Sequence, residues 1–90
     1  MALLIKTEQF GIQIPAAYVR VEQVRHNIFD GPMECVARYY ASNPGPIEAG
    51  VPAFRETVFS AEYSPTGGEI YAQAYVGAKK LPEFSGAIDI

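Results

Sequence analysis

The stretch Glu69-Ile-Tyr-Ala-Gln-Ala-Tyr-Val-Gly-Ala-Lys-Lys-Leu81 is the only part of this 90-residue sequence with clear helical periodicity. Its apolar side chains recur at the spacing that places them on adjoining stripes of a helix. Gly77 interrupts the stripes at a cost of about 1 kcal/mol relative to alanine, which indicates a close contact with another element. We expect this helix to cover one face of a sheet, with Tyr71, Tyr75 and Leu81 as its main core residues.

The ends of this helix are marked by its flanking residues. Thr66 is the expected N-cap, because Glu69 stands three residues after it, at the spacing of a capping box. Two lysines near the other end suit the negative pole of the helix dipole. Pro82 cannot continue a helix and disfavours helical backbone just before it, so the helix should end there.

Alternating apolar side chains outside the helix predict three long strands, at residues 18–25, 33–42 and 53–63. Val24 is out of phase with the preceding valines, which indicates a bulge near Gln23. Residues 2–14 form a smaller apolar hairpin that turns at Gly11 and stops at Pro15.

Short connections between these strands favour an antiparallel meander. The Asp30–Gly31 step predicts a tight turn, and the loop at 43–52 is longer and rich in proline. We therefore predict a single α+β domain spanning residues 1–90. It consists of an antiparallel β-meander with an N-terminal β-hairpin and one C-terminal helix packed on one face.

Composition excludes several classes of partner. The net charge is −3, and the basic residues are scattered except for one lysine pair, so no stripe of positive charge is available for nucleic acid. No apolar run approaches the ~20 residues that span a bilayer, so we expect no membrane partner. Cys35 is the only cysteine, which rules out an internal disulfide and a multi-cysteine metal site.

Residues that could carry chemistry are isolated from one another. His26 has no second histidine to form a metal site, and Cys35 within a strand is typical of a small core residue. Gly67-Gly68 precedes a helix but lacks the lysine and the glycine spacing of a phosphate-binding loop. We therefore predict no catalytic, cofactor-binding or metal-binding residue, and a protein that is not an enzyme.

The long strands carry large apolar side chains on both faces, although one helix can cover only one of them. Surplus apolar surface is typical of protein–protein contacts. The alternative is a small sandwich that buries both faces internally. The predicted partner-binding residues lie on the uncovered strand faces and in the proline-rich loop: Val36, Tyr40, Pro44, Pro46, Ile47, Phe59 and Tyr63.

Several short motifs resemble a group of small tailed-bacteriophage proteins encoded among virion structural genes. The motifs are Ile14-Pro15, Ala17-Tyr-Val-Arg-Val21, Ala72-Gln-Ala-Tyr75 and Leu81-Pro-Glu-Phe84, followed by Gly86-Ala87 and Asp89. They occur in the family's order along nearly the whole chain. Members often end in cysteine, whereas this sequence ends in Ile90, so a terminal thiol has no counterpart here.

The resemblance implies a structural component of a tailed-phage virion, present in many copies in the tail, neck, baseplate or fibre attachment. The implied partners are other virion proteins and further copies of the chain, and no cofactor is implied. Assembly would take place in the cytoplasm of the bacterial host, and the final location would be the virion. Two alternatives remain open: a capsid decoration or cement protein, and a non-virion phage protein that binds a host protein.

Overall fold

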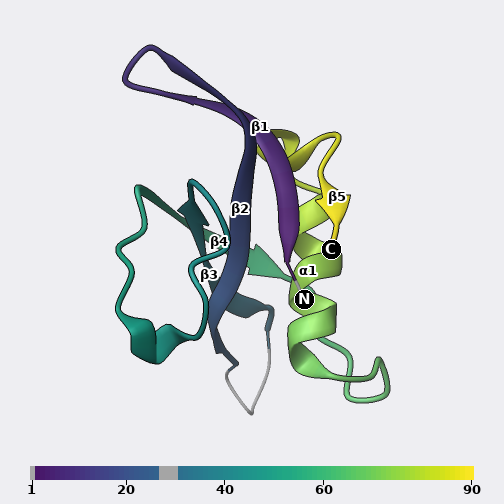
Figure 1. The fold of residues 1–90 in the computed structure, drawn as a ribbon. Helices are drawn as coiled ribbons and strands as arrows, with labels where there is room; N and C mark the ends of the chain where they lie inside the picture. Colours follow the sequence, from purple (N-terminus) through teal and green to yellow (C-terminus); the bar gives the residue numbers. More distant parts are fainter. Residues whose placement is uncertain (1, 27–30) are drawn as a thin grey trace.

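The computed structural model describes residues 2–26 and 31–90. Within them, five strands form one antiparallel sheet in the order β4-β3-β2-β1-β5, and helix α1 (Ile70–Lys79) lies against one face of it (Figure 1). The predicted α+β meander with one C-terminal helix is confirmed. The strands are β1 (Leu3–Gln9), β2 (Ile12–Arg25), β3 (Met33–Tyr40), β4 (Arg55–Ala61) and β5 (Ile88–Asp89).

Strands β1 and β2 form the N-terminal hairpin, whose outer end projects beyond the rest of the sheet (Figure 1). The two turn residues, Phe10 and Gly11, both have positive φ, at 53° and 76°. From the sequence, the second strand of the hairpin is predicted to stop at Pro15. This is wrong, because β2 continues through Pro15 as one 14-residue strand. A register shift between Ile5 and Thr7 leaves Pro15 in an irregular part of the ladder, where its missing N–H costs little.

The predicted bulge near Gln23 is confirmed by a register shift between Val21 and Gln23 in the β2–β3 ladder. At this point the Val21 N–H donates to the hydroxyl of Tyr75 on α1, at 2.9 Å. The pKa of Tyr75 is raised, chiefly because its hydroxyl is buried. The bulge and the helix are therefore joined by a buried hydrogen bond.

Small residues let α1 approach the sheet closely. Ala74, Tyr75 and Ala78 are its buried residues, and a Cβ added to Gly77 would lie only 2.4 Å from the Cβ of Ala61. The close contact predicted from Gly77 is thus confirmed. The core between helix and sheet is completed by apolar side chains from every strand except β5: Leu3, Ile5, Ala17, Val19, Val21, Met33, Cys35, Ala37, Tyr39 and Phe59, with Phe84.

The helix differs from its prediction in two details. Glu69, and not Thr66, is the N-cap: its carboxylate accepts the N–H groups of Tyr71 and Ala72 at 3.0 and 2.9 Å. Tyr75 is buried as expected, but Tyr71 is 38% exposed and Leu81 only half-buried. The helix begins at Ile70, so Thr66 lies three residues before the cap position, and its hydroxyl instead hydrogen-bonds with that of Ser64.

The C-terminal segment packs along the sheet. The 3₁₀ helix η2 (Pro82–Phe84) buries Phe84, and the Tyr39 hydroxyl donates to Glu83 at 2.8 Å. Burial and then this hydrogen bond raise the pKa of Tyr39 to about 12. Ala2 and Ile90 exchange two backbone hydrogen bonds, which join the C-terminal segment to the start of β1. The predicted Asp30–Gly31 turn lies partly outside the described residues, since Asp30 falls in 27–30.

Gly77→Ala tests the close approach of the helix. Overpacking costs about 1–3 kcal/mol or more, and a separation of 2.4 Å from the Cβ of Ala61 is a severe clash, whereas the gain in helix propensity is about 1 kcal/mol. We expect a net loss of about 2 kcal/mol in the free energy of unfolding, measured by urea denaturation. Adding Ala61→Gly should restore part of the loss, and Val76→Ala serves as a neutral control. A Gly77→Ala variant more stable than the parent would contradict the contact.

Tyr75→Phe tests the hydrogen bond at the bulge. The substitution keeps the ring but leaves the buried Val21 N–H without the hydroxyl acceptor, which should cost about 1–3 kcal/mol. Tyr75→Ala should cost about 3–5 kcal/mol, because the ring is lost too. Tyr71→Phe, on the same helix and partly exposed, is the matched control. Equal stability of the two Tyr→Phe variants would show that the buried bond contributes nothing.

Candidate functional site

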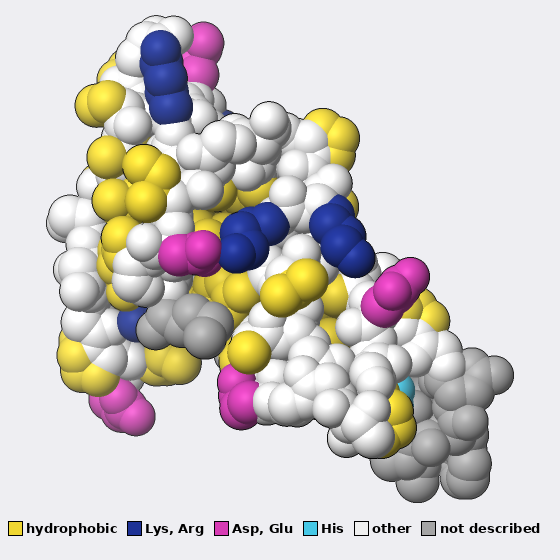
Figure 2. Space-filling view, turned by 90° about the vertical axis from the view of Figure 1, so that its right-hand side faces the viewer, with side chains coloured by type: hydrophobic (Ala, Val, Ile, Leu, Met, Phe, Trp, Pro, Cys, Tyr) yellow, Lys and Arg dark blue, Asp and Glu magenta, His cyan; other side chains and the backbone are white. Residues whose placement is uncertain are grey.

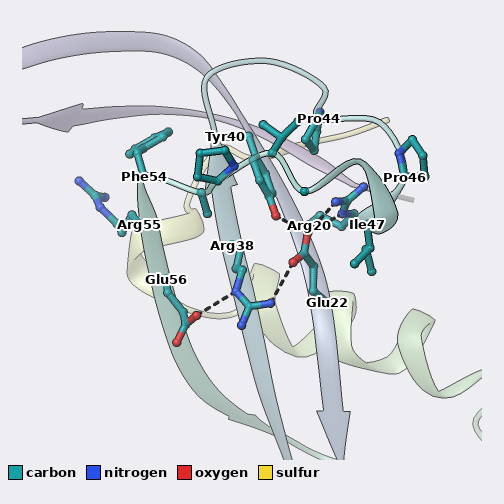
Figure 3. Close-up of a pocket in the computed structure, with 14 residues that line it drawn as sticks. Arg20, Glu22, Arg38, Tyr40, Pro44, Pro46, Ile47, Phe54, Arg55 and Glu56 are labelled. Carbon is teal, nitrogen blue, oxygen red and sulfur yellow. Dashed lines mark hydrogen bonds and ion pairs between the residues drawn. The ribbon is translucent and has the colours of Figure 1, made fainter.

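The loop between β3 and β4 folds back over the sheet face opposite α1 (Figures 1 and 3). It contains a short 3₁₀ helix, η1 (Ile47–Ala49), and its Gly45 carbonyl accepts a hydrogen bond from Arg20 at 2.6 Å. Between loop and sheet lies a cleft of about 530 Å³. We call it the loop cleft. It is lined by the charged side chains Arg20, Glu22, Arg38, Arg55 and Glu56, and by Tyr40, Phe54 and loop residues.

Glu22 is the centre of the charged cluster in the loop cleft (Figure 3). Its side chain is only 4% exposed and accepts from three groups: Arg20 Nε at 2.8 Å, Arg38 Nη1 at 3.0 Å and the Tyr40 hydroxyl at 2.5 Å. Arg38 also donates to Glu56 at 2.9 Å. The antiparallel register brings these residues together, since Arg20, Arg38 and Glu56 pair across three neighbouring strands.

The hydrogen bonds decide the ionisation of Glu22. Burial by itself would raise the pKa of Glu22, but the bonds from Tyr40, Arg38 and Arg20 outweigh burial and lower the pKa below its usual 4.5. Burial and the bond to Glu22 raise the pKa of Tyr40. The carboxylate is therefore held charged, and it binds two guanidinium groups and one hydroxyl. This arrangement is structural, because all its groups are engaged with one another.

Two of the predicted partner-binding residues are buried: Tyr40 lies under the β3–β4 loop, and Pro44 lies within that loop. Tyr40 is only 5% exposed. The prediction that Tyr40 lies on an uncovered face is wrong, because the loop packs over this end of the strand. Pro46 and Ile47 are exposed at the loop cleft, as expected. The outer face is thus partly covered from within the chain.

The face assignment of the last long strand is also wrong. Phe59 is 7% exposed and belongs to the core under the helix, since it pairs with Cys35 in the β3–β4 register. Val58, on the opposite face of that strand, is 60% exposed and pairs with the half-buried Val36 on the outer face. Tyr63 lies beyond the strand, half-buried against the core. Of the predicted partner-binding residues on the strands, Val36 and the loop-covered Tyr40 lie on the outer face, and Phe59 does not.

The tip of the β1–β2 hairpin was missed by the sequence prediction of partner-binding residues. Phe10 is 91% exposed and Ile12 67% exposed, the highest values among the large hydrophobic side chains of the described residues. A signal was present in the sequence, because a two-residue hairpin turn normally takes asparagine, aspartate or glycine at these positions. A phenylalanine in that place indicates a requirement other than folding.

Arg55 supports the outer end of this hairpin, next to the turn. Its guanidinium donates to the Thr7 hydroxyl at 2.8 Å, to the Gln9 side-chain oxygen at 2.8 Å and to the Glu8 carbonyl. It also lies over the ring of Tyr39, 5.1 Å from its centre. The hairpin outside the sheet is thus supported from β4, since a two-stranded ribbon alone is marginally stable.

Residues that could bind a metal are not brought together in the part of the chain that the structure describes. No group of three or more potential ligands forms there. Cys35 is buried, and burial raises its pKa. The His26 ring packs on Tyr63 with 4.0 Å between ring centres. On the helix side, hydrophobic side chains occur in separate patches between charged groups (Figure 2).

Comparison with known proteins adds no relative. No protein-family model matches the chain, and neither a curated protein nor a solved structure matches it significantly. Among residues 2–26 and 31–90, no helix is long and apolar enough to cross a membrane.

Glu22→Gln tests the charged cluster through its pH dependence. Because the folded-state pKa of Glu22 lies below the unfolded value, the ionised carboxylate stabilises the fold above the unfolded pKa. This contribution is lost as the pH falls through the folded pKa. The variant should be less stable by about 1–3 kcal/mol at neutral pH and lose less stability on acidification. Urea denaturation between about pH 3 and pH 7 measures both effects.

The control for this experiment is Glu62→Gln, a substitution at an exposed glutamate away from the cluster. It should change stability by no more than about 0.5 kcal/mol. If Glu22→Gln and Glu62→Gln show the same acid sensitivity as the parent, the cluster does not stabilise the fold.

Proposed function

We propose that this chain is a structural component of a tailed-phage virion that works by binding other virion proteins and further copies of itself. The tail side of the particle, including neck, baseplate and fibre attachment, is the favoured place. The basis is the resemblance of its ordered motifs, from Ile14-Pro15 to Leu81-Pro-Glu-Phe84, to small proteins of that class. The activity is assembly without catalysis.

The observation that carries the assembly role is the exposed apolar tip of the β1–β2 hairpin. Phe10 and Ile12 are the most exposed large hydrophobic side chains of the described residues, and they lie on a ribbon that projects from the sheet (Figure 1). Burying an aromatic side chain in a partner removes roughly 150–250 Å² of surface from water. The exposed apolar tip contributes nothing to the core of its own chain, whereas a neighbouring subunit could bury it.

The loop cleft supports the same role. Its rim carries the exposed side chains of Ile47 and Val51, at 62% and 47%, while the charged groups beneath are engaged with one another. Apolar groups around an inner polar network offer contact area without a reactive centre. Substrate conversion would need a nucleophile, a base and an orienting group in reach of one another.

Mass spectrometry of purified particles from the phage that encodes this chain tests the proposal. The chain should be present at a reproducible number of copies per particle and should follow the tails when heads and tails are separated. A phage protein known to remain in the host cell serves as the control for contamination. Absence from the particles would overturn the proposal, and recovery with heads would favour the decoration protein instead.

A further inference from the structure

The loop between β3 and β4 is attached to the sheet at very few points. We call its residues 43–52 the strap. Pro44 is the only buried residue of the strap, and residues 46–52 are all exposed. Within the part of the chain that the structure describes, one hydrogen bond joins the strap to the sheet, from the Arg20 guanidinium to the Gly45 carbonyl at 2.6 Å. Beyond this contact the strap passes over the loop cleft, whose volume is about 530 Å³ (Figure 3).

The strap keeps its own shape, and its two ends are fixed beside each other. The Gly45 N–H donates to Asn43 Oδ1 at 2.9 Å, and η1 is closed by two backbone hydrogen bonds at 3.0 and 3.1 Å. After the strap, the Phe54 N–H donates to the Tyr39 carbonyl at 2.9 Å, and the two rings meet edge to face. The strap can therefore leave the sheet as a unit, without loss of its turns and without unpairing β4.

Arg20 is positioned for its contact with the strap by groups of the sheet. Its Nε and Nη2 contact the Glu22 carboxylate at 2.8 and 2.7 Å, and its guanidinium lies over the Tyr40 ring, 5.4 Å from the centre. Nη1 remains for the Gly45 carbonyl. One hydrogen bond, even from a charged donor, contributes much less than the stability of a whole domain, so the strap should open far more often than the domain unfolds.

We propose that the strap opens and closes on the folded sheet, with the hydrogen bond between Arg20 and Gly45 as its latch. In the closed state the strap covers Tyr40, which is only 5% exposed although it lies on the face opposite α1. Opening uncovers the Tyr40 ring and the Arg20 guanidinium, so this face of the sheet presents two different surfaces. The inference goes beyond the proposed function, because it concerns the isolated chain and does not depend on a place in the virion.

Thiol labelling measures the opening of the strap. Pro44→Cys places a thiol at its buried residue, and Ile47→Cys places one at an exposed residue of the same strap as the reference. The native Cys35 is fully buried in the core and reports unfolding of the whole domain. With iodoacetamide and peptide mass spectrometry, the thiol introduced by Pro44→Cys should react roughly 10-fold or more faster than Cys35. It should react more slowly than the thiol introduced by Ile47→Cys.

Arg20→Met tests the latch itself. Methionine keeps an apolar stem but has no donor, so the strap loses its hydrogen bond to the sheet. Labelling of the thiol introduced by Pro44→Cys should become roughly 10-fold faster, the effect of losing one hydrogen bond from a charged donor. Arg38→Met is the matched control, because Arg38 donates to Glu22 as Arg20 does but makes no hydrogen bond to the strap among the described residues. It should leave the labelling of this thiol unchanged, even if Cys35 reacts faster.

Three outcomes would overturn the proposal. They are a thiol introduced by Pro44→Cys that reacts no faster than Cys35, the same thiol reacting as fast as the one introduced by Ile47→Cys, and an Arg20→Met variant that speeds its labelling no more than Arg38→Met does. The first would mean that the strap separates only when the domain unfolds, and the second that it does not close. All these measurements use the purified chain, so the strap and the place in the virion are tested separately.

Discussion

The close seating of helix α1 on the sheet is the constraint on which the rest of the fold depends. Gly77 and Ala61 bring the two backbones so near that no extra carbon fits between them. At that distance the Tyr75 hydroxyl reaches the Val21 N–H at the β2 bulge. A larger separation would lose both the packing and this buried hydrogen bond, so the small residues and the bulge belong to one arrangement.

The opposite face of the sheet is organised by a different kind of interaction. Glu22 is nearly buried, and a buried carboxylate is stable only when its hydrogen-bonding capacity is satisfied. Arg20, Arg38 and Tyr40 satisfy it, and Arg20 extends the network to the Gly45 carbonyl of the loop. The charged cluster thus links the loop to the sheet where no helix covers it, and it shapes the cleft between them.

The projecting β1–β2 hairpin contains one contact that stabilises the fold and one residue that does not. Arg55 ties the strand just before the turn to the body, and the turn itself retains Phe10 in a conformation that glycine or asparagine would adopt at lower cost. A chain selected for folding alone would have no reason to keep that residue there. Local strain combined with an exposed aromatic ring is therefore the feature on which the proposed assembly role rests.

The sequence by itself determined the helix, the α+β class, the bulge near Gln23 and the close contact at Gly77, because each leaves a local pattern of period or residue size. It could not place Phe59 and Val58, because both alternating sets of that strand are apolar, and only pairing with β3 decides which set meets the helix. Nor could it show that the loop buries Tyr40 and leaves Phe10 outside, since burial there results from contacts between residues distant in sequence.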